Sequence, residues 1–304
     1  MKHYLDIERL KPSIADGFSV GDEIYIEEKI DGANFSFKYD VASDSIKAFS
    51  RKKELDMKNN LRGAWDWAQT LDKELLKHVL LGDRLIVFCE WLVKHTVPYP
   101  AERYQHAYCF DIYDTVGKNY LGQYEAMVLA KAIGVEFVPV FYHGDFKSWD
   151  DVRSFVGRTD LGGDYGEGIV VKNMRLLKSE GCDDYFYTKI VGDKFSERKG
   201  SKEQKVPKEQ NQEFKRNHEL AETIITRARV EKLIHKMVDD GILPEDWGAK
   251  EMKIIAQNLF KNLYYDCVKE EKEVVDQIGE TFGKLCGSIG MGIAREILAE
   301  REQI

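Results

Sequence analysis

The sequence predicts an α+β fold in which a sheet-rich domain precedes a small all-helical domain, and three observations support this. Residues 24–27 and 35–39 alternate apolar and polar side chains, which is the pattern of half-buried strands. Toward the carboxy terminus, apolar residues recur instead at helical spacing. Between these parts, residues 199–207 have almost no apolar residue and no clear period. We therefore expect domains at residues 1–200 and 213–304 and a linker at 201–212.

The segment Lys29-Ile30-Asp31-Gly32 lies between the two predicted strands, so Lys29 is expected at a strand end or in a turn. A lysine can attack the α-phosphorus of a nucleoside triphosphate only as a neutral amine, a form that burial or neighbouring cations favour. Gly32 allows the backbone to pass close to a ligand. This pattern alone is a weak signal, because a surface turn accounts for it equally well.

Five further segments of suitable chemistry follow in order along the chain, which is hard to obtain by accident. In-line phosphoryl transfer needs lysine and arginine near the α-phosphate, and a divalent cation bridging to carboxylates. Glu90, Glu167 and Asp31 are candidates for the carboxylates, and Glu90 could equally accept hydrogen bonds from ribose hydroxyls. The five segments are Ser50-Arg51, Phe88-Cys89-Glu90, Phe110-Asp111-Ile112-Tyr113, residues 167–172 and Lys189.

Through these segments, residues 1 to about 200 resemble the covalent nucleotidyltransferase superfamily of ATP-dependent ligases and capping enzymes, and most of all the nick-sealing RNA ligase 2 family. The resemblance implies an antiparallel-sheet domain of the ligase and capping-enzyme type, with Lys29 as the nucleotide-accepting lysine. It favours a ribose contact for Glu90 and stacking of the purine on Phe110, although an aromatic residue in such an apolar run is more often a core residue. The residues to which it assigns roles are, for catalysis, Lys29, Lys172 and Lys189; for cofactor binding, Glu28, Lys29, Ile30, Asn34, Arg51, Glu90, Phe110, Lys172 and Lys189; and for the metal, Glu167.

Two positions depart from the family pattern. Cys89 stands where many members have glycine, which we expect to change only local packing. The last motif of the family usually carries two lysines separated by one residue, whereas here the second position is Val191. Either Lys189 acts alone, or Lys172, Lys194 or a shifted alignment supplies the second cation.

The composition is that of an ordinary soluble protein, with 43% hydrophobic and 32% charged residues in a chain of 304. No apolar run approaches ~18 residues, and the amino terminus, Met1-Lys2-His3-Tyr4, lacks an apolar signal region. The five cysteines are scattered without C-x-x-C pairs, which argues against a zinc site or a disulfide framework. We therefore expect a cytoplasmic protein without a membrane segment.

The net charge of −8 is unusual for a protein that binds a phosphate backbone, but the charge is unevenly distributed. Residues 187–216 carry nine Lys and Arg against five acids. This stretch could follow a duplex backbone, and a solvated linker of mixed charge is a comparable interpretation. A second, smaller cluster of basic residues consists of Arg51, Lys52, Lys53 and Lys58.

The carboxy-terminal domain is predicted to contain only helices. One apolar stripe, at residues 220–238, is expected to stop at Gly241, and two more follow at residues 252–263 and 274–285. A glycine-rich break at residues 287–292 is expected to precede a last helical piece. DNA ligases and capping enzymes usually carry an oligonucleotide-binding β-barrel in this place, so the helices favour an RNA ligase.

The resemblance thus implies an ATP-dependent RNA ligase that uses Mg²⁺ or Mn²⁺. Lys29 would attack ATP to form lysyl-AMP, the adenylate would pass to a 5′-phosphate, and a 3′-hydroxyl would then displace AMP. The expected substrate is RNA with nicked duplex or bridged ends, bound by a monomer. The alternatives are a GTP-dependent capping guanylyltransferase, and a catalytically inactive nucleic-acid-binding protein of the same fold.

Overall fold

The computed structural model describes residues 2–174, 187–192, 194–195 and 211–301. Residues 196–210, which hold most of the basic stretch noted above, lie outside the described residues. The chain divides into two units, Met1–Gly192 and Asp193–Ile304. Each unit is described by itself.

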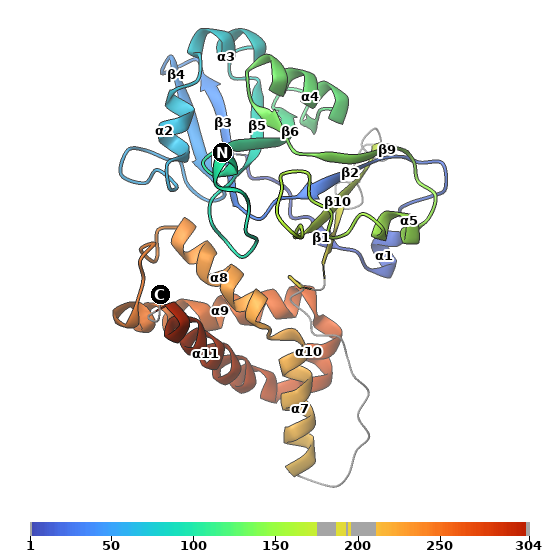
Figure 1. Cartoon of the computed structure of the whole chain (residues 1–304), viewed down its shortest axis with the longest axis vertical. Helices are drawn as coiled ribbons and strands as arrows, with labels where there is room; N and C mark the ends of the chain where they lie inside the picture. Colours follow the sequence, from blue (N-terminus) through green and yellow to red (C-terminus); the bar gives the residue numbers. More distant parts are fainter. Residues whose placement is uncertain (1, 175–186, 193, 196–210, 302–304) are drawn as a thin grey trace. The chain divides into compact units, whose positions relative to one another are not determined.

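The amino-terminal unit contains a sheet that we call the first sheet. Its strands lie in the order β1-β11-β10-β2-β9, and all neighbours are antiparallel except β1 and β11. One face packs around Ile26 and Ile169 against α1 (Pro12–Ala15) and α5 (Trp149–Arg153) (Figure 1). The strands are β1 (Glu8–Arg9), β2 (Glu23–Lys29), β9 (Val140–Asp145), β10 (Gly168–Asn173) and β11 (Tyr187–Val191).

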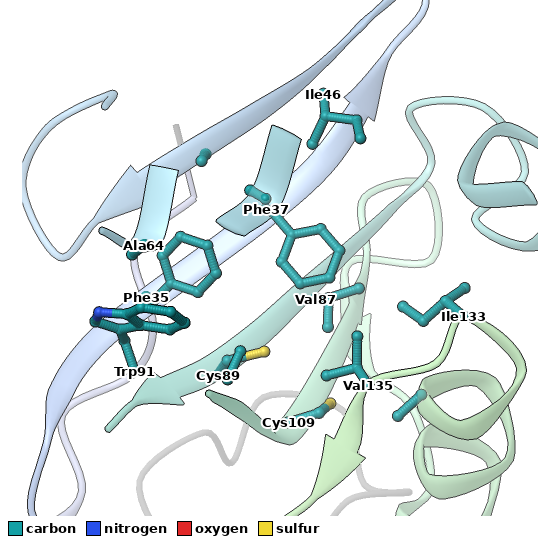
Figure 2. Packing of buried hydrophobic residues seen from close by; sticks show 14 of the residues in the cluster. Phe35, Phe37, Ile46, Ala64, Val87, Cys89, Trp91, Cys109, Ile133 and Val135 are labelled. Carbon is teal, nitrogen blue, oxygen red and sulfur yellow. The ribbon is translucent and has the colours of Figure 1, made fainter. Parts of the chain in front are cut away.

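A second sheet in the same unit has the strand order β4-β3-β5-β6-β7, with β8 beside β6. Neighbours are antiparallel except β6 and β8. Figure 2 shows Phe35, Phe37, Val87 and Trp91 gathered in the core on one face of this sheet. The strands are β3 (Ala33–Asp40), β4 (Ser45–Ser50), β5 (Leu85–Trp91), β6 (Ala107–Asp114), β7 (Asn119–Tyr120) and β8 (Glu136–Phe137), and the helices packed on this core are α2 (Ala64–Gln69), α3 (Lys73–Val79) and α4 (Gln123–Ala132).

The lysine segment connects the two sheets. Lys29 is the last residue of β2 in the first sheet, and Ala33 begins β3 in the second sheet. Each sheet buries one apolar face under helices, because successive side chains of a strand alternate between faces. The predicted antiparallel-sheet domain is therefore confirmed, and the faces not covered by these helices carry most of the polar residues singled out in the sequence.

The carboxy-terminal unit is helical, as predicted, and buries its own apolar core. The apolar stripe at 220–238 belongs to two helices, because Thr226 caps the second of them by accepting a hydrogen bond from the Arg229 amide. The stripe at 274–285 is likewise divided, at Gly279. The helices are α7 (Asn211–Ile224), α8 (Arg227–Asp239), α9 (Met252–Glu270), α10 (Lys272–Ile278) and α11 (Phe282–Arg301).

The predicted glycine-rich break at 287–292 is wrong, since α11 runs through it without interruption. Gly290 is buried against α9, where an added Cβ would lie 2.5 Å from a methyl group of Leu263. The missing side chain lets the two helices pack closely, which offsets the cost of about 1 kcal/mol that glycine brings to a helix interior. None of the helices within the described residues is long and apolar enough to cross a membrane.

Candidate active site

Lys29 lies at the end of β2, opposite Gly168 on β10. This register brings the residue before Gly168 next to Lys29, and Lys29 Nζ donates a hydrogen bond to Glu167 Oε2 at 2.6 Å. The lysine side chain keeps 20% of its surface exposed, whereas the carboxylate keeps 9%. The amine is therefore held by Glu167, and the lysine side chain remains partly exposed.

A strap, residues 92–99 after β5, fixes the segment that follows Lys29. The Asp31 carboxylate accepts hydrogen bonds from the amides of Thr96 and Val97, each at 2.8 Å, and His95 Nδ1 lies 3.5 Å from its other oxygen. Burial raises the pKa of Asp31, but the hydrogen bond and charge of His95 and the charge of Lys29 outweigh it and lower the value to about 2. Both Asp31 oxygens thus contact residues of the strap, so Asp31 is a weaker candidate for a metal ligand than Glu167.

Glu90 comes from β5 and closes the site from the second sheet. Its Oε1 accepts a hydrogen bond from the Gly32 amide at 3.1 Å, and Asn34 lies directly opposite Glu90 on β3. Gly32 is required here, because a Cβ would lie 2.6 Å from the Trp91 carbonyl oxygen. Burial raises the pKa of Glu90 to about 7, although the charges of Lys29 and His95 lower it. Glu90 can therefore both donate and accept hydrogen bonds near neutral pH.

Phe110 is presented by an irregularity in β6. Cys89 pairs with Cys109, whereas the preceding residue, Phe88, pairs with Asp111, so Phe110 is an extra residue in β6. Its half-buried ring packs edge-on against Tyr4, with ring centroids 4.7 Å apart. Lys172 Nζ lies 6.0 Å from the centroid of the same ring. An aromatic ring at this position is a candidate surface for stacking a base.

Lys172 lies in a buried polar cluster, with only 1% of its side chain exposed. Its Nζ lies 2.9 Å from Glu27 Oε2 and 3.1 Å from Asp111 Oδ2, and it donates to the Phe110 carbonyl at 2.6 Å. Burial lowers the pKa of Lys172, but the two carboxylates outweigh it and raise the value. Lys172 thus joins β10 to β2 and β6 as a buried cation.

Asp111 is the most heavily hydrogen-bonded acceptor in this cluster. Besides Lys172, it accepts from the Tyr4 hydroxyl, from Gln123 Nε2 at 2.6 Å and from the Tyr187 hydroxyl at 3.3 Å. These donors come from the amino-terminal segment, α4, β10 and β11. The cluster therefore ties both sheets together next to Phe110.

The remaining predicted residues lie in different surroundings. Lys189 on β11 lies opposite Val170, which lies opposite Glu27, so Lys189 shares the sheet face of Glu27 and Lys29. Arg51 is at the surface, 2.5 Å from Asp6 Oδ1. Ile30 is buried.

Glu28 points away from Lys29, because neighbouring residues of a strand face opposite sides. Its carboxylate accepts hydrogen bonds from Thr159 Oγ1 at 2.6 Å and from the Asp160 amide at 2.9 Å. Burial raises the pKa of Glu28, although these hydrogen bonds oppose the rise. Glu28 thus anchors the loop at 159–161.

The structure brings Lys29, Asp31, Glu90 and Glu167 together, and places Lys172 with Phe110 in the adjoining buried cluster. Glu27 and Tyr4 belong to this buried cluster but were not predicted from the sequence as site residues. Glu27 shares a strand face with Lys29, and this alternation is a signal that could have identified it. Tyr4 gave no such signal, since its hydrogen-bond partner Asp111 lies 107 positions away.

The site offers carboxylate oxygens as ligands for a divalent cation, but the described side chains do not supply a full coordination shell. Among the described residues, no three His, Cys, Asp or Glu side chains gather closely enough to hold a metal ion. Magnesium and manganese are commonly held by one or two carboxylates together with water and substrate phosphates. Glu167 and Glu90 next to Lys29 fit that kind of donor set.

The chain matches one protein-family model and several solved structures. A family model described as RNA ligase matches residues 22–191. The search of curated proteins gives no match. Among solved structures, the chain is similar to Naegleria gruberi RNA ligase, both as an apo mutant (21% identity, TM-score 0.46) and as a mutant with ATP and Mn (21%, 0.46). Each match covers 63% of this chain and 56% of the other, so this chain spans little more than half the length of those enzymes.

Proposed function

The chain belongs to the RNA ligase family, and on this basis we propose that it is an ATP-dependent RNA ligase that joins a 3′-hydroxyl to a 5′-phosphate. The observation that carries the proposal is the partly exposed Lys29 side chain, whose amine is hydrogen-bonded to Glu167 at 2.6 Å. A partly exposed lysine whose amine is hydrogen-bonded to a carboxylate that can accept its proton suits covalent capture of a nucleotide.

In the first step, Lys29 Nζ attacks the α-phosphorus of ATP. A nitrogen–phosphorus bond forms, the bond to pyrophosphate breaks, and the amine loses a proton. The Glu167 carboxylate is already hydrogen-bonded to Nζ, so it is placed to accept that proton. Lysyl-AMP and pyrophosphate are the products.

The nucleoside would be held by both sheets. The pKa of Glu90 is about 7, so near neutral pH its carboxyl can accept a hydrogen bond from a ribose hydroxyl or donate one to it. The Phe110 ring would stack on the base, and Lys172 fixes this ring by its hydrogen bond to the Phe110 carbonyl. In this proposal Lys172 positions the base platform and does not touch phosphate.

Glu167 would hold Mg²⁺ or Mn²⁺, whose chemistry is to neutralise the charge on the phosphate oxygens. Lys189, on the same sheet face as Lys29, would add a cation near the α-phosphate. In the later steps the adenylate passes to the 5′-phosphate of RNA, and the 3′-hydroxyl attacks that phosphorus and displaces AMP. We further propose nicked duplex or bridged RNA ends as substrate, a monomer as the active species and a cytoplasmic location.

The test is covalent labelling of the purified protein with ATP radiolabelled at the α-phosphate, in the presence of magnesium or manganese. Label should remain on the denatured protein, disappear in Lys29→Ala, and persist in Lys131→Ala, a matched change of an exposed lysine on α4. Label from GTP instead would establish the capping-type alternative. No label from either nucleotide, or label retained in Lys29→Ala, would contradict the proposal.

A further inference from the structure

The loop between β4 and α2, residues 51–62, is strongly basic, and we call it the basic loop (Figure 1). It carries five Lys and Arg against two acids in a chain of net charge −8. Each of the two acids has a partner other than these Lys and Arg side chains. Glu54 pairs with Lys47 on β4, and the Asp56 carboxylate accepts hydrogen bonds from the backbone amides of Lys58 and Asn59.

The basic loop is folded onto the core. Leu55 and Leu61 are buried in the hydrophobic cluster of the second sheet, and the Leu55 amide donates to the Ala48 carbonyl at 2.8 Å. The basic side chains stand outside this anchor, with Lys52 and Lys58 exposed. Because the backbone is already ordered, binding a ligand here costs little conformational entropy.

The end of the basic loop is held in a rare backbone conformation. Leu61, Arg62 and Gly63 all have positive φ angles, of 50°, 55° and 99°. The Trp91 indole donates to the Arg62 carbonyl at 3.4 Å, and Arg62 Nη2 donates to the Lys94 carbonyl at 3.1 Å. Two successive left-handed residues other than glycine persist only where surrounding contacts fix them, and such sites often have a function.

These contacts attach the basic loop to the strap that fixes the lysine segment. Arg62 holds Lys94, and the next three residues of the strap hold Asp31, two positions from Lys29. The Lys94 side chain is exposed and adds another positive charge next to the loop. A fixed, cationic surface is thus connected to the candidate active site through a few short contacts.

We infer that the basic loop, together with Lys94, binds the phosphodiester backbone of the RNA strands next to the break. The inference rests on the proposed function for the identity of the polyanion. A rigid array of exposed cations on an otherwise acidic protein is the electrostatic footprint of a nucleic-acid-binding surface. Its attachment to the strap would hold the RNA ends in a fixed place relative to Lys29.

The experiment compares the parent protein with the triple variant Lys52→Gln/Lys53→Gln/Lys58→Gln. Binding of a fluorescently labelled, nicked RNA duplex is measured by anisotropy over a series of salt concentrations, and self-adenylylation is measured separately. We expect RNA affinity to fall about tenfold or more, and the slope of log K against log salt to become less steep by about 2 to 3. Self-adenylylation should not change, which also shows that the variant is folded.

The matched control is Lys77→Gln/Lys131→Gln/Lys147→Gln, which removes the same charge from exposed positions elsewhere in the unit. It should retain the affinity and salt slope of the parent. Equal RNA binding by the two triple variants, or no RNA binding by the parent, would overturn the inference. If the parent forms no adenylate, the proposed function fails, whereas the RNA-binding comparison still decides the role of the basic loop.

Discussion

Lys29 and Lys172 face the same side of the first sheet, but their surroundings differ in kind. β2 and β10 are antiparallel neighbours, with Lys29 opposite Gly168 and Lys172 opposite Tyr25. Residues directly opposite one another share a sheet face, and so do residues two apart on a strand. The two lysines therefore lie at opposite ends of one polar strip.

At one end of the strip, Lys29 keeps 20% of its side chain exposed and is hydrogen-bonded to one carboxylate, Glu167. At the other end, Lys172 is 1% exposed and is held by two carboxylates and a backbone carbonyl. A buried cation with two buried counter-charges is locked in place, because removing it leaves those charges unpaired. A lysine with one partner and an open side can exchange that partner for a ligand. The difference separates a partly exposed lysine from one whose buried contacts hold three strands together.

The largest expected effect is on the buried end of the strip. Lys172→Met should lower the free energy of unfolding by about 3–5 kcal/mol, because the carboxylates of Glu27 and Asp111 would lose their buried cation. Urea denaturation followed by circular dichroism measures this change. Lys29→Met should lower the same quantity by less, since Lys29 is hydrogen-bonded to one carboxylate rather than lying between two and keeps 20% of its side chain exposed.

Glu27→Gln in the Lys172→Met background gives this prediction a control. Removing one of the two unpaired carboxylates should restore part of the lost stability, and the double-mutant cycle measures the coupling between Glu27 and Lys172. Equal losses in Lys172→Met and Lys29→Met would show that the two ends of the strip do not differ as described.

A smaller effect is expected in the pH dependence of stability at the open end. The folded-state pKa of Glu90, about 7, lies above the value near 4.3 expected for an unfolded chain. The folded protein therefore binds the additional proton between these values, so the contribution of Glu90 is complete below about pH 4 and is lost as pH rises through 7. Between pH 5 and 8, the parent should lose about 1–3 kcal/mol relative to Glu90→Gln.

The measurement is the free energy of unfolding of both proteins at several pH values. Using the difference between them removes the contribution of Glu27, whose pKa burial also raises to about 7 and which has the same sign. Lys29→Met should extend the loss due to Glu90 to higher pH, because the charge of Lys29 lowers the pKa of Glu90. A pH-independent difference between parent and Glu90→Gln would contradict this account.

The open end of the strip was more predictable from sequence than the buried end. Alternation on either side of Lys29 predicted the strands that became β2 and β3. Gly32 was expected to let the backbone pass close to a ligand, and the close neighbour that the structure shows is the Trp91 carbonyl. Local patterns sufficed there, because strand period and turn chemistry act over a few residues.

Lys172 was assigned to catalysis because of its place in a motif, and its actual partners could not be inferred locally. Asp111 is 61 positions away, and in the sequence Glu27 has the place of a polar residue on a half-buried strand. Only the packing of the two sheets makes both groups buried. The prediction that the glycines of α11 break the helix was wrong for a similar reason. Gly290 lets a second helix pack closely through Leu263, and this contact cannot be inferred from the local sequence.

The smallest expected effect concerns the ion pair between Arg51 and Asp6 at the surface. Both side chains are well exposed, at 42% and 60%, so water and salt screen their attraction. Asp6→Asn should therefore change the free energy of unfolding by less than about 1 kcal/mol, and still less in 0.5 M salt than at low salt. Because Arg51 is exposed, breaking this pair leaves no buried charge behind, in contrast to the loss of Lys172. A stability loss in Asp6→Asn that rivals that of Lys172→Met would mean that partner number and burial do not set the cost of losing a charge in this protein.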